Sequence, residues 1–207
     1  MKFNLGTKLN MTQFFDDTGR AYPATLLSIS PITVTQVRTA EKDGYVAVQV
    51  GSGSKKRANK PETGHLKGVG PFRHLKEFRL NNPDDAKNFN TGDVMDVSLF
   101  SAGDIVEVSG ISKGKGFQGV VKRHGFGGGP RTHGQKHSER EAGSIGGGGR
   151  AGGRVAKGMR MAGRMGGDRV TVKYLKVLAI DKEHGELLVS GAVPGRRGTL
   201  IEVRSMK

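Results

Sequence analysis

The sequence has no cysteine among its 207 residues. A disulfide framework and a thiolate metal site are therefore excluded, and a reducing, cytoplasmic setting is the default expectation. No apolar run approaches the roughly 20 residues that a membrane-spanning helix needs. Met1 to Asp17 also lack the apolar segment and small-residue cleavage site of a secretory signal. We therefore expect neither export nor insertion into a membrane.

Hydrophobic and aromatic residues are also scarce, at 34% and 6% of the chain, which is low for a compact enzyme. The chain has fewer carboxylates than cations: 34 Lys and Arg against 19 Asp and Glu give a formal net charge of +15. A sequence pI near 10.3 points to nucleic acid or an anionic membrane surface as the partner. The many glycines disfavour the long amphipathic helix that membrane binding would use, so nucleic acid is the favoured partner.

Glycine and positive charge are concentrated between residues 113 and 169. This extension contains 19 of the 34 glycines and thirteen Lys or Arg, but only three carboxylates. Ordering a residue costs roughly 1–2 kcal/mol of backbone entropy, and the extension has few large apolar side chains to offset that cost. Its like charges also repel one another. The extension is therefore predicted to become ordered only when a polyanion binds it.

Short segments rich in β-branched residues recur along the rest of the chain and predict strands. Val46, Val48 and Val50 alternate as in a half-buried strand, and Asp181 to Gly185 join two further segments as a hairpin. The predicted strands span residues 24–29, 32–37, 45–50, 95–99, 104–109, 170–180, 186–193 and 199–203. Many short strands with little helix predict a mainly β fold built on a closed or nearly closed antiparallel barrel.

The expected organisation is a β-barrel body of residues 1–112 and 170–207, with the basic extension 113–169 inserted between two of its strands. The two ends of the extension should therefore lie near each other. Within the body, residues 51–80 form a basic region. It is expected to contain a solvated loop and at most a short helix, near Phe72 to Phe78.

The run from Gly114 to Gly119 has the spacing of a dinucleotide-binding turn. That turn requires a following helix, and here residues 120–126 lead into three glycines and a proline, which should prevent one. A backbone that cradles phosphates is the favoured interpretation, with charge added by Lys113, Lys115 and Lys122.

His133 and His137 lie four residues apart, with His124 upstream, so a metal site has to be considered. This spacing suits a metal only on a helix, and Gly134 and Pro130 argue against one. Histidines that contact phosphate, sugar or a stacked base are favoured instead, and no metal or cofactor is expected. No nucleophile, base and orienting acid fall into a catalytic pattern either.

Two further stretches of the extension have two possible roles each. Met159, Met161 and Met165 could form a helical face that contacts nucleotides, but packing of the base of the extension against the barrel is favoured. The glycines from Gly146 to Gly153 mark the tip. A disordered linker is one possibility there, but the interleaved arginines favour phosphate contact.

Several segments, in order along nearly the whole chain, resemble the universal large-subunit ribosomal protein L-three family in its bacterial form. The segments that carry the resemblance are residues 6–16, Pro31 with 34–37, 60–61 with 64–65, 74–79, 113–117, 132–134, 143–146, 161–166, 170–172 and 191–195.

The resemblance implies a translation-protein-like β-barrel and a structural, non-enzymatic role in the large ribosomal subunit. It further implies binding near the 3′ end of the 23S-type rRNA, nucleation of subunit assembly, neighbouring ribosomal proteins, and an extension that reaches toward the peptidyl-transferase centre. Gly147 and its neighbours stand where some members carry a methylated glutamine, so that modification is not expected here. Asn10 replaces the usual glycine before Met11.

We expect no catalytic residue, no small-molecule substrate and no membrane partner. Two alternatives remain open, namely a nucleotide- or metal-dependent enzyme and a nucleic-acid chaperone with a permanently disordered extension. The expected RNA contacts in the body are Lys55, Lys56, Arg57, Lys60, Arg73 and Lys76. Those in the extension are Lys113, Lys115, Lys122, Arg123, His124, Arg131, His133, Lys136, His137, Arg140, Arg150, Arg154, Lys157, Arg160 and Arg164.

Overall fold

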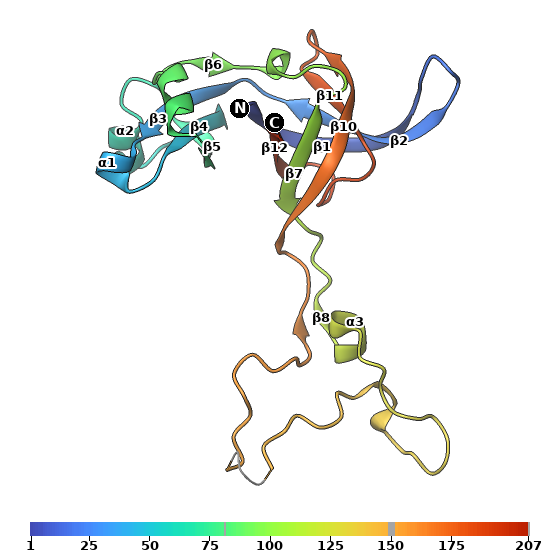
Figure 1. The fold of residues 1–207 in the computed structure, drawn as a ribbon. Coiled ribbons are helices and arrows are strands. Elements are labelled where there is room, and N and C mark those ends of the chain that lie inside the picture. The colour runs from blue at the N-terminus through green and yellow to red at the C-terminus, as the bar shows by residue number, and fades with distance from the viewer. Residues whose placement is uncertain (81, 149–151, 207) are drawn as a thin grey trace. The chain divides into compact units, whose positions relative to one another are not determined.

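The computed structural model describes all residues except 81, 149–151 and 207 (Figure 1). The chain divides into two compact units, which are described separately. From here on, the body is the unit formed by Met1–Ile111 and Arg169–Lys207, and the extension is the unit Ser112–Asp168, which is shifted by one residue from the predicted range 113–169.

Six strands of the body close into an antiparallel barrel in the order β1-β12-β7-β10-β11-β2 (Figure 1). The mainly β class predicted from the sequence is confirmed. The barrel strands are β1 (Phe3–Phe15), β2 (Ala21–Ile29), β7 (Ile105–Ile111), β10 (Arg169–Asp181), β11 (Glu186–Ser190) and β12 (Leu200–Ser205).

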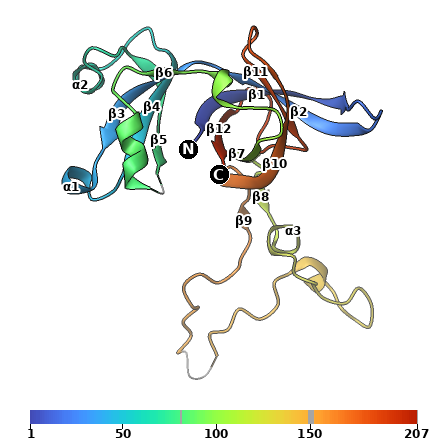
Figure 2. The same cartoon turned by 45° about the horizontal axis from the view of Figure 1, so that its top comes forward.

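Alternating apolar residues fill the barrel. Val106 and Val108 of β7 and Ile201 and Val203 of β12 are fully buried in one hydrophobic cluster. Each such side chain contributes roughly 1.5–3 kcal/mol when it leaves water. The first and last strands are neighbours, since Phe3 pairs with Arg204, and both chain ends consequently lie at the barrel (Figure 2).

The hairpin predicted at Asp181 to Gly185 is confirmed, because β10 and β11 pair across it. The carboxylate of Asp181 accepts hydrogen bonds from the backbone amides of Glu183 and His184. Gly185 adopts φ +65°, which suits glycine in a tight turn.

A second, four-stranded sheet in the order β5-β4-β3-β6 completes the body. Its core includes residues from β1, because the ring of Phe3 stacks on Phe78 with 4.4 Å between the centroids. Sequence reasoning had assigned all strands to one barrel and missed this sheet. Its strands are β3 (Ile32–Arg38), β4 (Ala47–Ser54), β5 (Phe72–Arg79) and β6 (Val94–Met95).

Two local predictions in this region are wrong. The segment expected to be a short helix near Phe72 to Phe78 is strand β5, which pairs along β4. The strand predicted over residues 95–99 ends at Met95, and Val97–Leu99 form a short 3₁₀ turn instead. The helical elements of the body are α1 (Ala40–Asp43), α2 (Lys60–His65), η1 (Pro83–Asn88) and η2 (Val97–Leu99).

The extension contains short elements joined by long irregular segments. They are β8 (Phe117–Gln118), α3 (Val120–His124), η3 (Ser138–Arg140) and β9 (Gly163–Arg164). Val120 is the one extension residue among the buried hydrophobic side chains of the described chain.

Candidate nucleic-acid interface

The two ends of the extension, residues 112–118 and 163–168, run side by side as an antiparallel pair, which we call the neck. The amide of Ser112 donates to the carbonyl oxygen of Asp168 at 2.9 Å. Farther along, the amide of Lys115 donates to Met165 at 2.9 Å, and β8 pairs with β9. The prediction that the ends of the extension meet is confirmed.

Glycine is required at one point of the neck. Gly166 has φ +76°, and a Cβ atom there would lie 2.2 Å from the carbonyl oxygen of Lys113. A larger residue would therefore push the two strands of the neck apart.

A short helix, α3, follows the glycine-rich turn, so the prediction that no helix could form there is wrong. It has five residues, begins after Gly119 and ends at Gly125, whose φ is +72°. The prediction that glycines limit helix formation here was correct in one respect, because Gly125 ends the helix after little more than one turn. A helix this short does not provide the dinucleotide-binding geometry that the Gly114 to Gly119 spacing would need.

Two predicted RNA contacts on α3 bind the opposite strand of the extension. Arg123 donates through Nη1 to the carbonyl oxygen of Met161 at 2.7 Å, and His124 donates through Nε2 to the same oxygen at 3.0 Å. These side chains therefore bridge the extension internally, and each is still partly exposed.

Backbone groups also close the outer loop of the extension. The amide of Gly129 donates to the carbonyl oxygens of Ser138 and Glu139 at 3.2 Å each. A Cβ atom on Gly128 would lie 2.0 Å from the Glu139 oxygen, so only glycine fits there. The loop is thus held by main-chain contacts and not by a hydrophobic core.

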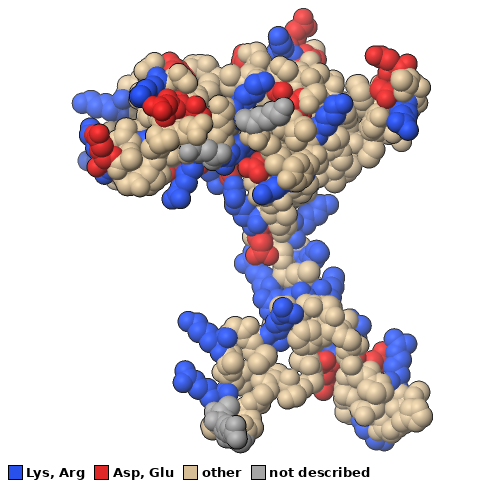
Figure 3. Space-filling view, viewed as in Figure 1, with Lys and Arg blue, Asp and Glu red and all other residues tan. Residues whose placement is uncertain are grey.

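Most cations of the extension have no carboxylate partner. Arg131 pairs with Glu139 at 2.7 Å, and this is the one ion pair among the described residues of the extension. In Figure 3, the visible face of this unit carries many Lys and Arg side chains and few Asp or Glu. The exposed cations without such a partner in the described chain are Lys113, Lys115, Lys122, Lys136, Arg140, Arg154, Lys157, Arg160 and Arg164. Arg150 lies outside the described residues.

The histidines do not form a metal site of the kind that was considered. His133 has φ +60° and lies outside any helix, as does His137, and both are exposed. Within the described residues, no group of three or more His, Cys, Asp or Glu is placed to hold a metal ion.

None of the three methionines lies in a helix, so the helical face that was considered does not form, and their packing against the barrel stays a prediction. Met159 is 40% exposed and Met161 is 38% exposed. Exposed thioethers in a basic segment remain available for contact with a partner.

The predicted contacts in the body fall into two groups. Lys55 binds the Glu62 carboxylate at 2.6 Å and, with the Asn59 amide, lowers the pKa of that carboxyl. Lys76 binds Glu202 at 3.0 Å. These two lysines already have carboxylate partners.

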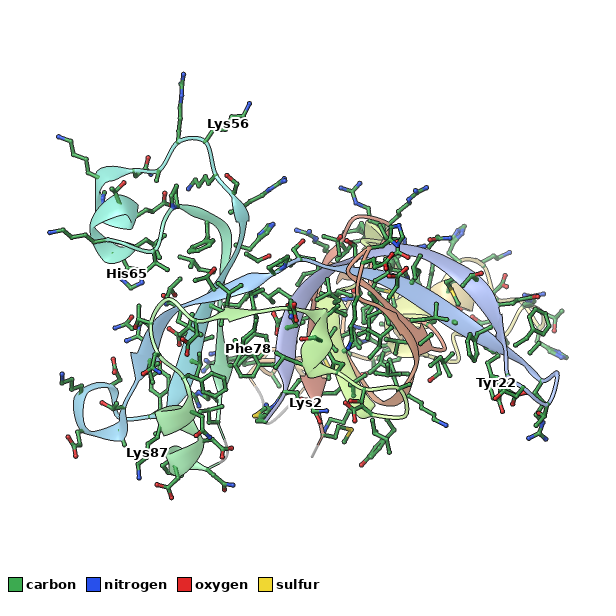
Figure 4. All side chains as sticks on the ribbon, turned by 90° about the horizontal axis from the view of Figure 1, so that it is seen from above. Lys2, Tyr22, Lys56, His65, Phe78 and Lys87 are labelled. Atoms are coloured by element: carbon green, nitrogen blue, oxygen red, sulfur yellow. The ribbon has the colours of Figure 1, made fainter. Side chains whose placement is uncertain are left out.

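The other predicted body contacts are exposed, and the described chain gives them no carboxylate partner. In Figure 4, Lys56 lies on the loop that leads from β4 to α2. The members of this group are Lys56, Arg57, Lys60 and Arg73. Sequence reasoning did not separate the two groups, although the Asn59-Glu62 spacing, typical of a capped helix, is a signal that could have identified the partner of Lys55.

The body also contains a charged groove that was not predicted from the sequence. It is lined by residues of β5, β7, β10 and β12, and Glu202 lies within it. The carboxylate of Glu202 binds Lys76 of β5 and Arg169, the first residue of β10. Burial alone would raise the pKa of Glu202, but the hydrogen bonds from Arg169 and Lys76 outweigh it, so the pKa is lowered. No local pattern reveals this cluster, because its members are far apart in the sequence.

The fold and the charge together define a class. A β-barrel body with an exposed, glycine-rich and largely unneutralised cationic extension has the features of a protein that binds a polyanion. No helix in the described part of the chain has the length and hydrophobicity of a membrane span.

Comparison with known proteins gives the family. The family model described as "Ribosomal protein L3" matches residues 74–187. The chain is 52% identical to the large ribosomal subunit protein uL3 of Cutibacterium acnes over 205 residues, which cover 97% of this chain and 90% of that protein. It is 50% identical to the protein of the same name from Herpetosiphon aurantiacus, covering 96% and 93% of the two chains. The corresponding protein of Corynebacterium diphtheriae is 46% identical, with 97% and 92% covered.

The chain therefore belongs to the ribosomal protein L3 family, in its bacterial form. It is a structural protein of the ribosome and not an enzyme.

Proposed function

We propose that this ribosomal protein is a primary rRNA-binding constituent of the large subunit. It binds near the 3′ end of the 23S-type rRNA, nucleates subunit assembly beside neighbouring ribosomal proteins, and extends residues 113–169 toward the peptidyl-transferase centre. Large-subunit rRNA and ribosomal proteins are its partners, with no small-molecule substrate.

The observation that supports this proposal is the exposed, unpaired charge of the extension. Nine of its exposed, described cations lack a carboxylate partner, and the glycines among them let backbone amides approach phosphates closely. Arginine adds bidentate phosphate contacts and stacking on bases. The strongest expected contacts are Arg150, Arg154, Arg160 and Arg164.

Exposed body cations give a second, smaller contact area. Lys56, Arg57, Lys60 and Arg73 are available to phosphates without breaking an ion pair of the described chain. Lys55 and Lys76 would have to share or exchange their carboxylate partners, so they are the weaker members of the proposed set.

A salt titration with two RNA fragments tests the proposal. The protein is titrated with transcripts of the 3′ and 5′ halves of the large-subunit rRNA between 50 and 200 mM salt. If 6–10 phosphates are engaged, affinity for the 3′ transcript should fall about 10³- to 10⁵-fold over this range, by analogy with duplex DNA. Equal affinity for both halves would contradict the assigned binding region. A salt-independent affinity would contradict the ionic contacts.

Proteolysis distinguishes this function from that of a chaperone with a permanently disordered extension. Trypsin should cleave the extension in the free protein, whereas the same bonds should be protected in assembled large subunits. Equal cleavage in both states would favour the chaperone.

A further inference from the structure

Tyr174 has an unusual backbone conformation. Among the described residues other than glycine, only His133 and Tyr174 have a positive φ, and that of Tyr174 is +59°. A bulky aromatic residue is strained in this left-handed region. Such strain in a strand points to a function when the surrounding structure enforces it and the side chain contributes nothing to the core.

A β-bulge enforces this conformation. On the side facing β7, Val172 pairs with Val108 and Leu175 pairs with Val106, so Lys173 and Tyr174 together lie opposite one residue, Glu107. The extra residue shifts the alternation of β10, and Leu175 returns to the barrel core. Two consecutive side chains therefore face outward.

The ring of Tyr174 is left in solvent by this arrangement. Its side chain is 76% exposed, as much as any large hydrophobic or aromatic residue in the described chain. It contributes little to the core, and a glycine would fit the backbone better. Stability alone gives no reason for tyrosine at this position.

Two lysines flank Tyr174 along the chain. Lys173 precedes Tyr174 and Lys176 follows two residues later, and both are exposed. The facing carboxylate, Glu107, lies 3.9 Å from the guanidinium of Arg204, so its charge is partly offset. An exposed aromatic ring between two lysines has the chemistry of a platform for a single-stranded nucleotide, in which the ring stacks on the base and the lysines contact the flanking phosphates.

We propose that Tyr174 is a stacking site for an unpaired base of rRNA, with Lys173 and Lys176 contacting the adjacent phosphates. This inference rests on the proposed rRNA binding and adds a site on the barrel, outside the extension. A base inside a duplex does not expose its face, so the ligand is a looped or bulged nucleotide. The net charge of +15 favours RNA over a protein surface as the occupant.

A tryptophan substitution reports on the site directly. The chain contains no tryptophan, so Tyr174→Trp introduces a single indole at this position. We expect its fluorescence to be quenched on titration with the 3′ large-subunit rRNA transcript, with the same midpoint as binding measured by filter retention. Phe15→Trp is the matched control, because Phe15 is 62% exposed but is followed by Asp16 and Asp17. Its fluorescence should not change beyond the inner-filter effect.

Two further variants separate stacking from a purely structural role. Tyr174→Phe keeps the ring and should bind the transcript as the wild type does. Tyr174→Gly removes both the ring and the strain, so its thermal midpoint should stay equal or rise while affinity falls roughly 5- to 100-fold, the usual effect of losing one stacked base. A thermal midpoint that is unchanged or higher shows that weaker binding is not due to misfolding.

The outcomes distinguish this inference from the function on which it rests. If the wild type binds the transcript but Tyr174→Trp is not quenched, or Tyr174→Gly binds equally well, the stacking site is wrong and the proposed function stands. If the wild type does not bind the transcript, both fail. Quenching by purified ribosomal proteins and not by RNA would overturn the inference in favour of a protein contact.

Discussion

Interdigitated apolar side chains hold the body together, whereas the ordered contacts of the extension are mainly hydrogen bonds to its backbone. Twenty-five of the buried hydrophobic residues of the described chain belong to the body, and one, Val120, belongs to the extension. The two units also differ in how far their positive charges are paired with carboxylates. Body cations such as Lys55 and Lys76 bind carboxylates, whereas most extension cations have none. We therefore propose that the body folds by itself and that the extension becomes ordered against a polyanion.

The largest expected effect is on RNA affinity when the extension is removed. Joining Ser112 to Asp168 through two glycines should leave the barrel intact, because these residues are already hydrogen-bonded neighbours. Affinity for the 3′ rRNA transcript should fall at least about 10³-fold, and the logarithmic salt dependence should become shallower by about 4. Filter binding at several salt concentrations measures both.

The matched control changes charge on the body alone. Replacing Lys56, Arg57 and Lys60 with glutamine should make the slope of log affinity against log salt concentration shallower by at most about 2. An equal or larger loss in this variant would contradict the assignment of most contacts to the extension.

The next effect concerns stability and should appear only in the body. Ile201 is fully buried in the barrel, so Ile201→Ala should lower the free energy of unfolding by about 2–5 kcal/mol. Met161 in the extension is 38% exposed, and Met161→Ala should change the free energy of unfolding by no more than about 0.5 kcal/mol. Urea denaturation followed by circular dichroism compares the two, and similar losses would show that the extension has a core after all.

A smaller and local effect is expected in the neck. Gly166→Ala places a Cβ atom against the carbonyl oxygen of Lys113 and should cost roughly 1–3 kcal/mol of neck stability. Gly167→Ala is the control, since Gly167 has nearly the same φ, +75°, but its Cβ would meet only the flexible side chain of Arg164. Amide exchange of Lys115 and Met165, measured in the assembled subunit, should be faster in the first variant than in the second. Identical rates would mean that the close approach at Gly166 is unimportant.

The smallest effect is pH-dependent and lies in the charged groove of the body. Because the pKa of Glu202 is lowered from its ordinary value of 4.5, the carboxylate stabilises the fold at pH values above that value. This contribution is lost as the pH falls through the lower, folded-state pKa. Glu202→Gln should therefore cost about 1 kcal/mol at neutral pH and nothing in strong acid.

Urea denaturation at several pH values measures this difference. Glu183→Gln provides the control, because Glu183 is exposed in the hairpin and no ion pair in the described chain includes it. A pH-independent difference between the wild type and Glu202→Gln would show that the ion pairs of Glu202 do not stabilise the body.

Local sequence patterns were sufficient for much of this protein. Alternating valines identified β4 as a strand, although it is buried on both faces and not half-buried as predicted. The turn at Asp181 to Gly185 identified a hairpin, and the excess of glycine and charge identified residues 113–169 as different from the rest. These features could be predicted because each depends on neighbouring residues alone, through side-chain alternation, turn geometry or charge density.

The second sheet, the partners of the lysines and the bulge at Tyr174 could not be predicted in this way. Phe72–Arg79 forms a strand because β4 supplies its hydrogen bonds, and Glu202 binds Lys76 across 126 positions of sequence. Tyr174 faces solvent only because the register with β7 slips by one residue. The composition of this chain thus determined its class and the character of its extension, whereas pairing between distant strands decided which side chains are buried, neutralised or left exposed. Register and ion pairing depend on distances in space, and these do not follow from the order of residues along a chain.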